Sequence, residues 1–373
     1  MHIDLLRSLP APACAYMYDT AALRARAAMV RRGLPPGATL LYAVKANGHP
    51  AVVKALAEAC DGLEVASGGE LALAVEAGAK RIVFGGPGKT DAELEAAMKA
   101  GALINVESVH ELRRLAAIAT APTPPKVCLR VNRPGGGLQG SHTMTGTPTP
   151  FGIEEAQLGE ALRVPGVEVT GFHLHAVSNN LDGKAHAAFV QDSVDWSADT
   201  ADKSGIELRV VNVGGGFGVD YESTAEMDLS GLSDVRRPPA VDLIFEPGRY
   251  LAADAGEYAA TVLDLKTTHG RTFAVLRGGT HHFRLPAAWG YSHPFTIVLV
   301  DEWPHPYPRP EVTDTEVDAV GELCTPRDVL TRGQHVDRLR AGDIIVFSRA
   351  GAYGWDISHH EFLRHDPPHF LII

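Results

Sequence analysis

The chain has 373 residues, of which 34 are Lys or Arg and 45 are Asp or Glu. The formal net charge of −11 repels phosphate backbones and anionic lipids, so it argues against nucleic acid or a membrane surface as the partner. A hydrophobic content of 45% allows a large buried core, and we expect a globular protein that acts on a small molecule.

The cysteines indicate the redox environment. Cys14, Cys60, Cys128 and Cys324 are widely spaced and form no Cys-x-x-Cys pair, which favours a reducing compartment over a disulfide framework or a zinc site. The first residues show no basic, apolar and cleavable pattern, and no apolar run is long enough to cross a bilayer. We therefore expect a cytoplasmic protein without a metal site.

Short apolar runs alternate with helix-period stretches over the first two thirds of the chain. The helix-period stretches include residues 51–59, 69–77, 91–99 and 109–118, where Ala, Leu and Glu dominate. Alternating strands and helices predict a parallel (β/α)8 barrel, which needs eight strands. The predicted strands span residues 39–43, 62–65, 81–84, 103–106, 126–131, 167–174, 207–213 and 241–246.

Beyond residue 250 the pattern changes to β-branched alternation with Pro-rich turns at 304–310, which predicts a second, all-β domain. A β-like segment at 14–18 precedes the first helix and is expected to add a strand to that domain. Residues 132–152 are rich in Gly, Thr and Pro and too long for a tight connection, so they predict a functional or mobile loop. The alternating segments are 260–266, 272–276, 296–300 and 344–347.

Polar residues and glycines stand at the carboxyl ends of the predicted strands, where the chemistry of a (β/α)8 barrel takes place. Lys45 closes the first strand, where it either extends to solvent or forms a Schiff base with an aldehyde cofactor. His173 and His175 face the same side of the sixth strand, where they can stack on a flat cofactor, pack in the core or bind a metal. The other residues at strand ends are Ser67, Gly85, Gly86, Glu107, Ser108, Arg130, Asn132, Ser178, Gly214, Gly215, Gly216 and Glu246.

Two of these strand ends have features of a cofactor site. The glycines at 214–216 form either a tight turn or an anion-binding nest for a phosphate, to which Arg249 can add charge unless it forms a rim ion pair. Glu246 at a barrel mouth needs a partner, because an unpaired buried carboxylate is costly. An Arg within the same motif is one partner. A protonated pyridine nitrogen is the other, and it would make the ring a strong electron sink that favours decarboxylation.

Taken together, these residues resemble the fold-type III pyridoxal-phosphate decarboxylases, the ornithine/diaminopimelate decarboxylase-like family, over essentially the whole chain. The resemblance implies an alanine-racemase-like TIM barrel at residues 20–250 and a β-domain formed by residues 1–19 and 251–373. The matching motifs are Tyr42-Ala-Val-Lys45-Ala-Asn47, Val65-Ala-Ser67-Gly-Gly-Glu70, Gly214-Gly-Gly216, Glu246-Pro-Gly-Arg249, Gly321-Glu-Leu-Cys324 and Gly351-Ala-Tyr353.

The same resemblance implies the cofactor, the assembly and the site. Pyridoxal 5′-phosphate is the implied cofactor, and a homodimer is implied, in which the β-domain of one chain completes the active site of the other. Ala176-Val177 departs from the Ile-Gly that the family places before Ser178, which bears on the phosphate contact of Ser178. The implied cofactor-binding residues are Lys45, Arg130, His175, Ser178, Gly214, Gly215, Gly216, Glu246, Gly248, Arg249 and Tyr353.

Further motifs resemble the siderophore-biosynthesis branch of the family, the citryl-diaminopropionate decarboxylases of staphyloferrin B assembly. They are Phe84-Gly-Gly-Pro-Gly-Lys-Thr90, Phe172-His-Leu-His175-Ala-Val-Ser178-Asn-Asn-Leu181, Gly278-Gly-Thr-His-His-Phe-Arg284-Leu-Pro286 and Gly351-Ala-Tyr-Gly-Trp-Asp-Ile-Ser-His-His360. The resemblance implies citryl-diaminopropionate, a diamino acid with an acylated side-chain amine, as the substrate.

One departure from the wider family bears on the substrate. Family members that bind a distal ammonium carry an acidic residue after the cysteine, whereas this chain has Thr325. A neutral residue does not compensate the desolvation of an ammonium, which argues against free ornithine, lysine or diaminopimelate. Arg284, with His281 and His282 nearby, is instead expected to receive citryl carboxylates, unless this cluster is a solvated rim.

The expected mechanism assigns two catalytic residues. The substrate amine displaces Lys45 from the cofactor, the α-carboxylate leaves as carbon dioxide, and Cys324 of the partner subunit then protonates the α-carbon. A small buried hydrophobe is the other interpretation of Cys324. The remaining alternatives are a decarboxylase of a free amino acid, an amino-acid racemase, which Glu246 in place of Arg disfavours, and a non-catalytic cofactor-binding homologue.

Overall fold

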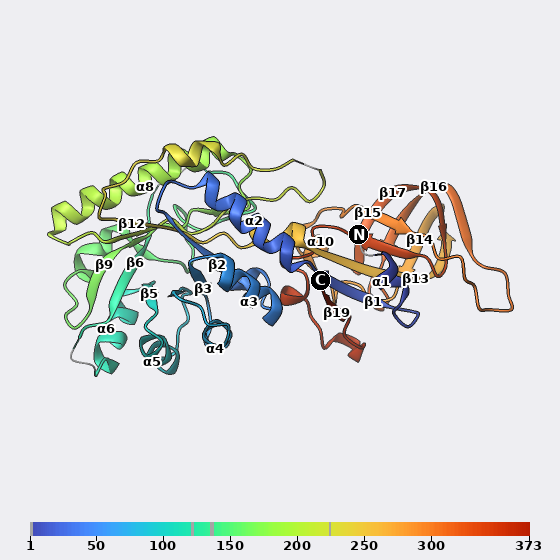
Figure 1. Cartoon of the computed structure of the whole chain (residues 1–373), viewed down its shortest axis with the longest axis horizontal. Helices are drawn as coiled ribbons and strands as arrows, with labels where there is room; N and C mark the ends of the chain where they lie inside the picture. The colour runs from blue at the N-terminus through green and yellow to red at the C-terminus, as the bar shows by residue number, and fades with distance from the viewer. Residues whose placement is uncertain (1–2, 121–122, 135–137, 224) are drawn as a thin grey trace. The chain divides into compact units, whose positions relative to one another are not determined.

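The computed structural model describes residues 3–120, 123–134, 138–223 and 225–373 (Figure 1). By internal contacts the chain divides into two compact units. The barrel unit consists of Leu23–Val219 and Ala225–Leu251, and the β unit consists of Met1–Ala22, Asp220–Thr224 and Ala252–Ile373.

The barrel unit contains a closed sheet of eight parallel strands. The strands follow one another around the sheet in chain order, and pairing of the last strand with the first closes it. All eight predicted strands are confirmed, with ends that differ by a few residues. The strands are β2 (Thr39–Ala43), β3 (Gly62–Val65), β4 (Ile82–Phe84), β5 (Leu103–Val106), β6 (Lys126–Asn132), β9 (Glu168–His173), β11 (Val210–Asn212) and β12 (Asp242–Phe245).

Helices surround this sheet (Figure 1). The predicted helices at 51–59, 69–77, 91–99 and 109–118 are confirmed, whereas the longest helix, α8, was not among those predicted. Asp182 caps the first turn of α8, and Gly205 ends it with a φ of 68°. The helices are α2 (Thr20–Gly33), α3 (Pro50–Ala59), α4 (Gly68–Glu76), α5 (Asp91–Lys99), α6 (Val109–Ile118), α7 (Leu158–Ala161), α8 (Gly183–Ser204) and α9 (Arg249–Ala252).

Some polar residues at the strand ends begin helices. The hydroxyls of Ser67, Thr90 and Ser108 each accept a hydrogen bond from the third residue of the following helix, at α4, α5 and α6. Thr90 and Glu93 form a complete capping box. Ser67 and Ser108, which the sequence grouped with the strand-end polar residues, are therefore explained by helix capping.

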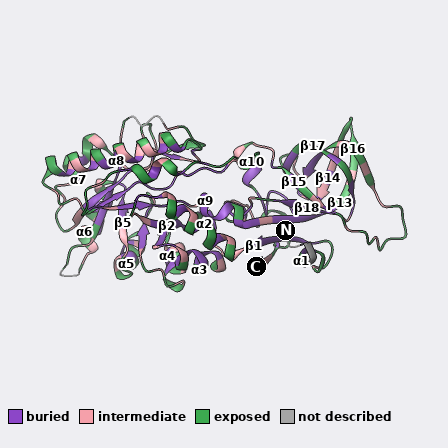
Figure 2. Ribbon diagram, turned by 45° about the horizontal axis from the view of Figure 1, so that its top comes forward, coloured by how far each residue is buried: buried purple, intermediate pink, exposed green. Residues whose placement is uncertain are grey.

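The barrel interior changes from apolar to polar along the strands. The part further from the carboxyl ends of the strands is a buried cluster of Leu41, Val83, Cys128, Val210 and Ile244. Side chains two residues apart on a strand point the same way, so the next inward positions are Ala43, Gly85, Arg130, Asn212 and Glu246. Charged and amide groups therefore occupy the interior at the carboxyl ends of the strands. Figure 2 shows much of the strand ribbon in purple, the colour of buried residues.

The β unit is built mainly of antiparallel strands. The expected N-terminal strand is confirmed, because β1 pairs antiparallel with β13 and parallel with β19. The cluster of Leu6, Ala15, Met17, Ala259 and Val346 forms part of its core. Its elements are α1 (Ile3–Arg7), β1 (Cys14–Tyr18), β13 (Gly256–Thr268), β14 (Arg271–Leu276), α10 (Leu285–Trp289), β15 (Phe295–Val298), β16 (Glu311–Val320), β17 (Val329–Arg340), β18 (Ile344–Phe347) and β19 (His369–Ile372).

Parts of the segment after β6 pair with other strands. β7 (His142–Thr143) pairs antiparallel with β10 (Val177–Ser178), and β8 (Ile153–Glu154) pairs parallel with the end of β6. The predicted loop at 132–152 thus contains a short strand, while its residues 135–137 lie outside the described residues.

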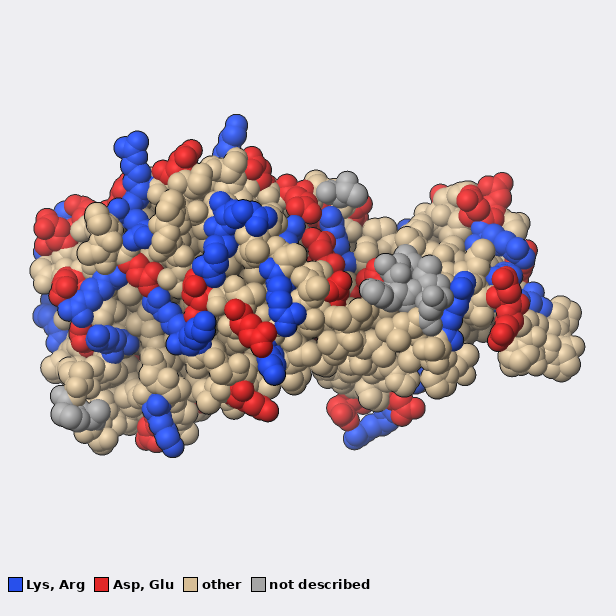
Figure 3. Space-filling model, viewed as in Figure 1, with Lys and Arg blue, Asp and Glu red and all other residues tan. Residues whose placement is uncertain are grey.

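Figure 3 shows acidic and basic side chains interspersed over the face in view. Within the described parts of the chain, no helix is both long enough and apolar enough to span a membrane.

Candidate active site

Lys45 lies in a 3₁₀ turn, Val44–Ala46, immediately after β2. Two hydrogen bonds fix the chain around it: the Tyr42 hydroxyl donates to the carbonyl of Asn47 at 3.0 Å, and the Asn47 side chain accepts from the amide of His49 at 2.9 Å. The Lys45 side chain is 48% exposed at the strand end, where the sequence placed it. A nucleophilic amine in this position is accessible from the barrel mouth.

The amine of Lys45 forms an ion pair with Glu64, a residue that the sequence analysis did not select. Glu64 lies on β3 and its side chain is only 6% exposed. Burying a carboxylate is costly unless a cation or hydrogen bonds compensate it, and Lys45 supplies that cation. The signal was present in the sequence as a carboxylate in the apolar strand Gly-Leu-Glu-Val.

Glu246 is buried directly after β12. Its Oε1 accepts a hydrogen bond from Asn212 Nδ2 at 2.5 Å, and its Oε2 lies 3.8 Å from His173 Nε2. Burial raises the pKa of Glu246 to about 8, and the nearby Glu64 carboxylate adds to the rise, while the Asn212 bond opposes it. Without a ligand, Glu246 therefore holds a proton at neutral pH. Asn212, which the sequence analysis also missed, fixes its orientation.

This raised pKa predicts a pH dependence of stability. Between pH values of about 5 and about 8 the folded, cofactor-free protein binds a proton at Glu246 that the unfolded chain has released, so stability falls as pH rises through this range. We expect the melting temperature of cofactor-free Glu246→Gln to fall less over the same range, since Gln does not titrate. Parallel slopes for the two proteins in a pH series of thermal melts would contradict this assignment.

The three glycines after β11 form a turn that leaves no room for side chains. Cβ atoms on Gly214, Gly215 and Gly216 would lie 2.4 Å from His175 Nδ1, 2.4 Å from the Glu246 carbonyl and 2.8 Å from the Val177 carbonyl, respectively. Gly214 and Gly216 also have positive φ values of 66° and 92°. The Gly214 amide donates to Asn212 Oδ1 at 2.9 Å.

The amides of Gly215 and Gly216 donate no hydrogen bond to any described residue. Ser178 and Arg249 belong to the same end of the barrel, and Arg249 Nη2 donates to Ser178 Oγ at 3.1 Å. A Cβ on Gly248 would lie 2.9 Å from the Cβ of Ala46, so the start of α9 packs against the Lys45 turn. The backbone N–H groups, the hydroxyl and the guanidinium together suit an anionic group such as a phosphate.

His173 and His175 have neighbouring rings, with centroids 6.3 Å apart and a tilt of 27°. Burial, followed by the charge of Arg130, lowers the pKa of both imidazoles, so they are neutral at physiological pH. Neither nitrogen of His173 has a hydrogen-bond partner among the described residues. In the same described set, no group of three or more His, Cys, Asp or Glu is arranged to hold a metal.

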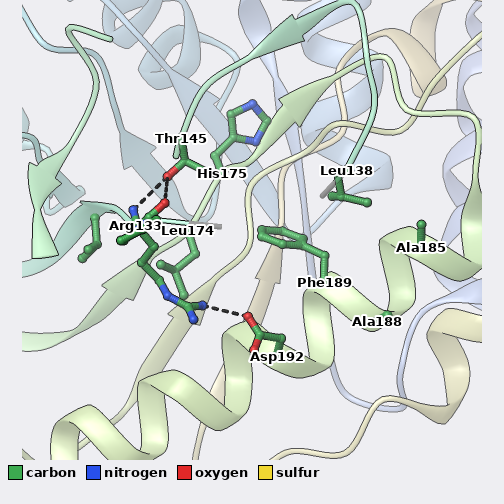
Figure 4. Close-up of a pocket in the computed structure, with 11 residues that line it drawn as sticks. Arg133, Leu138, Thr145, Leu174, His175, Ala185, Ala188, Phe189 and Asp192 are labelled. Atoms are coloured by element: carbon green, nitrogen blue, oxygen red, sulfur yellow. Dashed lines mark hydrogen bonds and ion pairs between the residues drawn. The ribbon is translucent and has the colours of Figure 1, made fainter. Parts of the chain in front are cut away.

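A cavity of about 460 Å³ lies beside His175, between the segment after β6 and helix α8 (Figure 4). Its wall is mainly apolar, and Arg133 forms an ion pair with Asp192 at 2.9 Å at its edge. The lining residues are Val131, Arg133, Pro134, Leu138, Thr145, Leu174, His175, Ala185, Ala188, Phe189 and Asp192.

In the β unit, Cys324 lies exposed on the turn between β16 and β17. Buried Asp328 organises this turn, because its two carboxylate oxygens accept from the amides of Thr280 at 2.6 Å and Leu323 at 2.8 Å. The Thr325 carbonyl accepts from the amide of Asp328 at 3.2 Å. Burial raises the pKa of Asp328, and these hydrogen bonds oppose the rise. Exposure of the thiol contradicts the interpretation of Cys324 as a buried hydrophobe.

Asp328→Ala is expected to destabilise the β unit by about 2–4 kcal/mol, because it leaves two buried amides without acceptors. Asp337→Ala is the matched control, since Asp337 is an exposed residue of β17 whose removal should cost less than about 0.5 kcal/mol. Chemical denaturation measures both values, and equal losses in the two variants would contradict the role given to Asp328.

The remaining predicted residues of the β unit differ in exposure. Arg284 is exposed and Tyr353 is half-buried, with its ring 5.6 Å from that of Trp289. His281 and His282 are buried, which contradicts the solvated-rim interpretation of these two rings. Burial lowers the pKa of His281 to about 4 and that of His282 still further, so neither ring carries a charge at neutral pH.

The barrel residues fit pyridoxal phosphate on three observations: an accessible lysine amine, a glycine turn with N–H groups available to a phosphate, and a buried protonated carboxyl for a ring nitrogen. Such a set on a (β/α)8 barrel with a β unit defines an alanine-racemase-fold enzyme with a pyridoxal cofactor. Residues 20–253 match the family model for "Pyridoxal-dependent decarboxylase, pyridoxal binding domain". The chain belongs to this family and is a pyridoxal-phosphate-dependent carboxy-lyase.

The similarity to known proteins extends over all or nearly all of the chain. It is 38% identical to the 2-[(L-alanin-3-ylcarbamoyl)methyl]-2-hydroxybutanedioate decarboxylase of Staphylococcus aureus, over 100% of this chain and 96% of that protein. It is 32% identical to the L-glutamyl-[BtrI acyl-carrier protein] decarboxylase of Niallia circulans, over 95% of this chain and 87% of that protein. The crystal structure of diaminopimelate decarboxylase from Helicobacter pylori with L-lysine has a TM-score of 0.87 at 26% identity and covers 100% of this chain and 94% of its own.

Proposed function

We propose that this enzyme removes the α-carboxylate of an acylated diamino acid, and that citryl-diaminopropionate is its substrate in siderophore biosynthesis. The full-length similarity to the Staphylococcus aureus enzyme carries this proposal. The name of that enzyme describes an alanine unit joined through an amide to a hydroxybutanedioate, which is an acylated diamino acid. Thr325 supports the proposal, because a neutral residue after Cys324 suits a substrate whose side-chain amine has lost its charge.

The barrel residues are proposed to hold and orient the cofactor. Lys45 holds its aldehyde, and the amides of Gly215 and Gly216 hold its phosphate. Residues Arg130, Ser178, Gly214, Gly248 and Arg249, together with Tyr353, complete the proposed phosphate and ring contacts. Pyridoxal phosphate, when bound, supplies an electron sink for the electron pair left behind by carbon dioxide.

Three residues are proposed to control protons and the ring position. Glu246 holds a proton at its carboxyl, as its raised pKa allows, and presents it to the ring nitrogen. Asn212 supports this role, since it occupies Oε1 and leaves Oε2 for the ring. His175 is proposed to lie against the ring face as a neutral imidazole.

The β unit is proposed to complete the site of a second copy in a homodimer, with residues 1–19 and 251–373 as the contributing domain and residues 20–250 as the cofactor-binding barrel. Cys324 of the partner subunit would transfer its thiol proton to the α-carbon after carbon dioxide has left. Its exposure supports this role. The barrel cysteines Cys60 and Cys128 do not suit it, because they are buried and burial raises the pKa of each to about 12.

Arg284 and Thr325 are proposed to contact the acyl group. Arg284 is exposed, and its planar guanidinium can bind citryl carboxylates in a bidentate manner. Direct contacts from His281 and His282 to the citryl carboxylates are not proposed, because both rings are buried and neutral. We also propose a cytoplasmic location, which is consistent with the four cysteines being free thiols.

Carbon dioxide release from a panel of substrates tests the proposal. Citryl-diaminopropionate should exceed free diaminopropionate, ornithine, lysine and diaminopimelate in kcat/KM by at least about 100-fold, the discrimination expected when a site cannot compensate a buried charge. A preference for diaminopimelate would instead support decarboxylation of a free amino acid, as in several relatives. Racemisation without carbon dioxide release would support the racemase alternative.

A further inference from the structure

Glu107 follows β5 at the barrel mouth, and the functions proposed above do not use it. Its side chain is buried, and its carboxylate accepts three hydrogen bonds. Oε1 accepts from Arg130 Nη1 at 2.9 Å and from the amide of Gly86 at 2.9 Å. Oε2 accepts from the amide of Gly152 at 3.1 Å. Because a buried carboxylate needs such compensation, this arrangement holds Glu107 in one position.

The buried ion pair of Lys89 with Glu111 holds the backbone of Glu107 in place. The amide of Glu107 donates to Glu111 Oε2 at 2.9 Å, and Glu111 Oε1 binds the amine of Lys89 at 2.7 Å. Lys89 is 1% exposed and also donates to the carbonyls of Gly86 and Asn105. The turn after β4, strand β5 and the first turn of α6 therefore form one network around Glu107.

The Glu107–Arg130 pair also holds the end of the segment after β6. The Arg130 guanidinium lies 4.6 Å above the ring of Phe151, and the next amide, that of Gly152, binds Glu107. Gly152 has a φ of 76°, and a Cβ there would come within 3.0 Å of the amide of Asn132. A single carboxylate thus links a charged residue of the barrel mouth to the position where this segment rejoins the barrel.

The described part of this segment, residues 138–152, makes a second contact with the site. The amide of Ser141 donates to the Ser178 carbonyl at 2.7 Å, and that of Met144 donates to the Ala176 carbonyl at 2.7 Å. Asn180 Nδ2 donates to the Gln139 carbonyl at 2.6 Å. Residues 138–152 are therefore attached at one end to Glu107 and Arg130, and further along to the strand that carries Ser178.

We propose that Glu107 is a positioning residue: it fixes Arg130 in the barrel mouth and, through Gly152, fixes residues 138–152 as a wall of the cofactor site. The inference rests on the proposed function for the roles of Arg130 and Ser178. Its effect on residues 138–152 does not depend on that function, since the contacts exist in the protein without ligand.

The first test compares Glu107→Gln with Glu93→Gln in the cofactor-free protein. Glu93 is a matched control, because it also accepts from two backbone amides, those of Gly68 at 2.7 Å and Thr90 at 2.8 Å, at the same end of the barrel. We expect backbone amide hydrogen exchange in residues 138–152 to be at least about tenfold faster in Glu107→Gln. The side-chain amide of glutamine cannot accept all three hydrogen bonds that the carboxylate accepts. Unchanged exchange, or an equal effect of Glu93→Gln, would overturn the proposal.

The second test measures whether Glu107 acts through Arg130. We expect Glu107→Gln to weaken binding of pyridoxal phosphate by about tenfold and to move the pH midpoint of the absorbance of the bound cofactor downward, because a negative charge is lost near the site. In an Arg130→Met background, Glu107→Gln should change cofactor affinity by less than about twofold. Additive effects in this double-mutant cycle would overturn the positioning role.

These readouts separate failure of the inference from failure of the proposed function. A protein that binds no pyridoxal phosphate would contradict the proposed function, while hydrogen exchange would still test the link from Glu107 to residues 138–152. If Glu107→Gln does not fold, Arg130→Met is the substitute variant, because it removes the other half of the pair. Unchanged exchange in residues 138–152 of a folded Arg130→Met would then contradict the inference.

Discussion

The Lys45→Ala variant is expected to lose decarboxylase activity by about 10³- to 10⁴-fold, because the amine proposed to hold the cofactor aldehyde is removed. Lys45 stands in an accessible turn after β2, and its amine is oriented by Glu64. Kinetics with saturating pyridoxal phosphate measure the loss. The absorbance of the protein-bound cofactor should change together with activity.

Lys54→Ala is the control for this variant, since Lys54 is an exposed lysine on helix α3. It should retain activity within about twofold, as expected for a surface substitution. Lys45→Ala leaves Glu64 buried without its cation, so the fold of the variant has to be checked. Circular dichroism does this and distinguishes loss of chemistry from loss of fold. A folded Lys45→Ala enzyme within tenfold of the wild-type activity would show that Lys45 does not carry the chemistry.

The Cys324→Ala variant is expected to reduce formation of the amine product by about 10²- to 10³-fold, because the α-carbon loses its proposed proton donor. In a single turnover, carbon dioxide release should fall less than amine formation, since the missing proton is needed after the carboxylate has left. Product analysis by mass spectrometry measures the difference. A clean amine product at the wild-type rate would contradict the proton-donor role.

Mixing the two inactive variants tests whether each site is shared between subunits. If Cys324 acts in the partner's barrel, equal amounts of Lys45→Ala and Cys324→Ala should recover about a quarter of the wild-type activity, because half of the dimers are mixed and each of these has one intact site. Mixing Lys45→Ala with itself after the same subunit exchange is the control. Absence of recovery despite proven exchange would place both residues in one chain's site.

The barrel could be predicted because its strands are short apolar runs between helix-period stretches. The period-two rule also predicts which side chains point inward, as Arg130 and Glu246 show. Helix α8 was missed because its 22 residues mix Ala with Ser, Asp and Thr and have few apolar positions. Strands β16 and β17 were missed for a similar reason, since charged residues occupy much of this hairpin.

The site could be predicted where a residue type is unusual at a strand end, as for Lys45 and the glycine turn. Partners such as Glu64 and Asn212 were missed because their significance depends on which side chain lies opposite them across the barrel. The importance of Glu107 likewise follows from three donors that come from distant parts of the sequence. Such relations arise from tertiary packing, which a strand pattern does not contain.

The most direct test of the proposed decarboxylation follows the fate of an isotopically labelled carboxylate. Citryl-diaminopropionate labelled at the α-carboxylate of its diaminopropionate unit should release labelled carbon dioxide with the purified enzyme and pyridoxal phosphate. The same substrate labelled in its citryl carboxylates should release none. Release of label from the citryl group, or no release from either substrate while free diaminopimelate is decarboxylated, would contradict the proposed function.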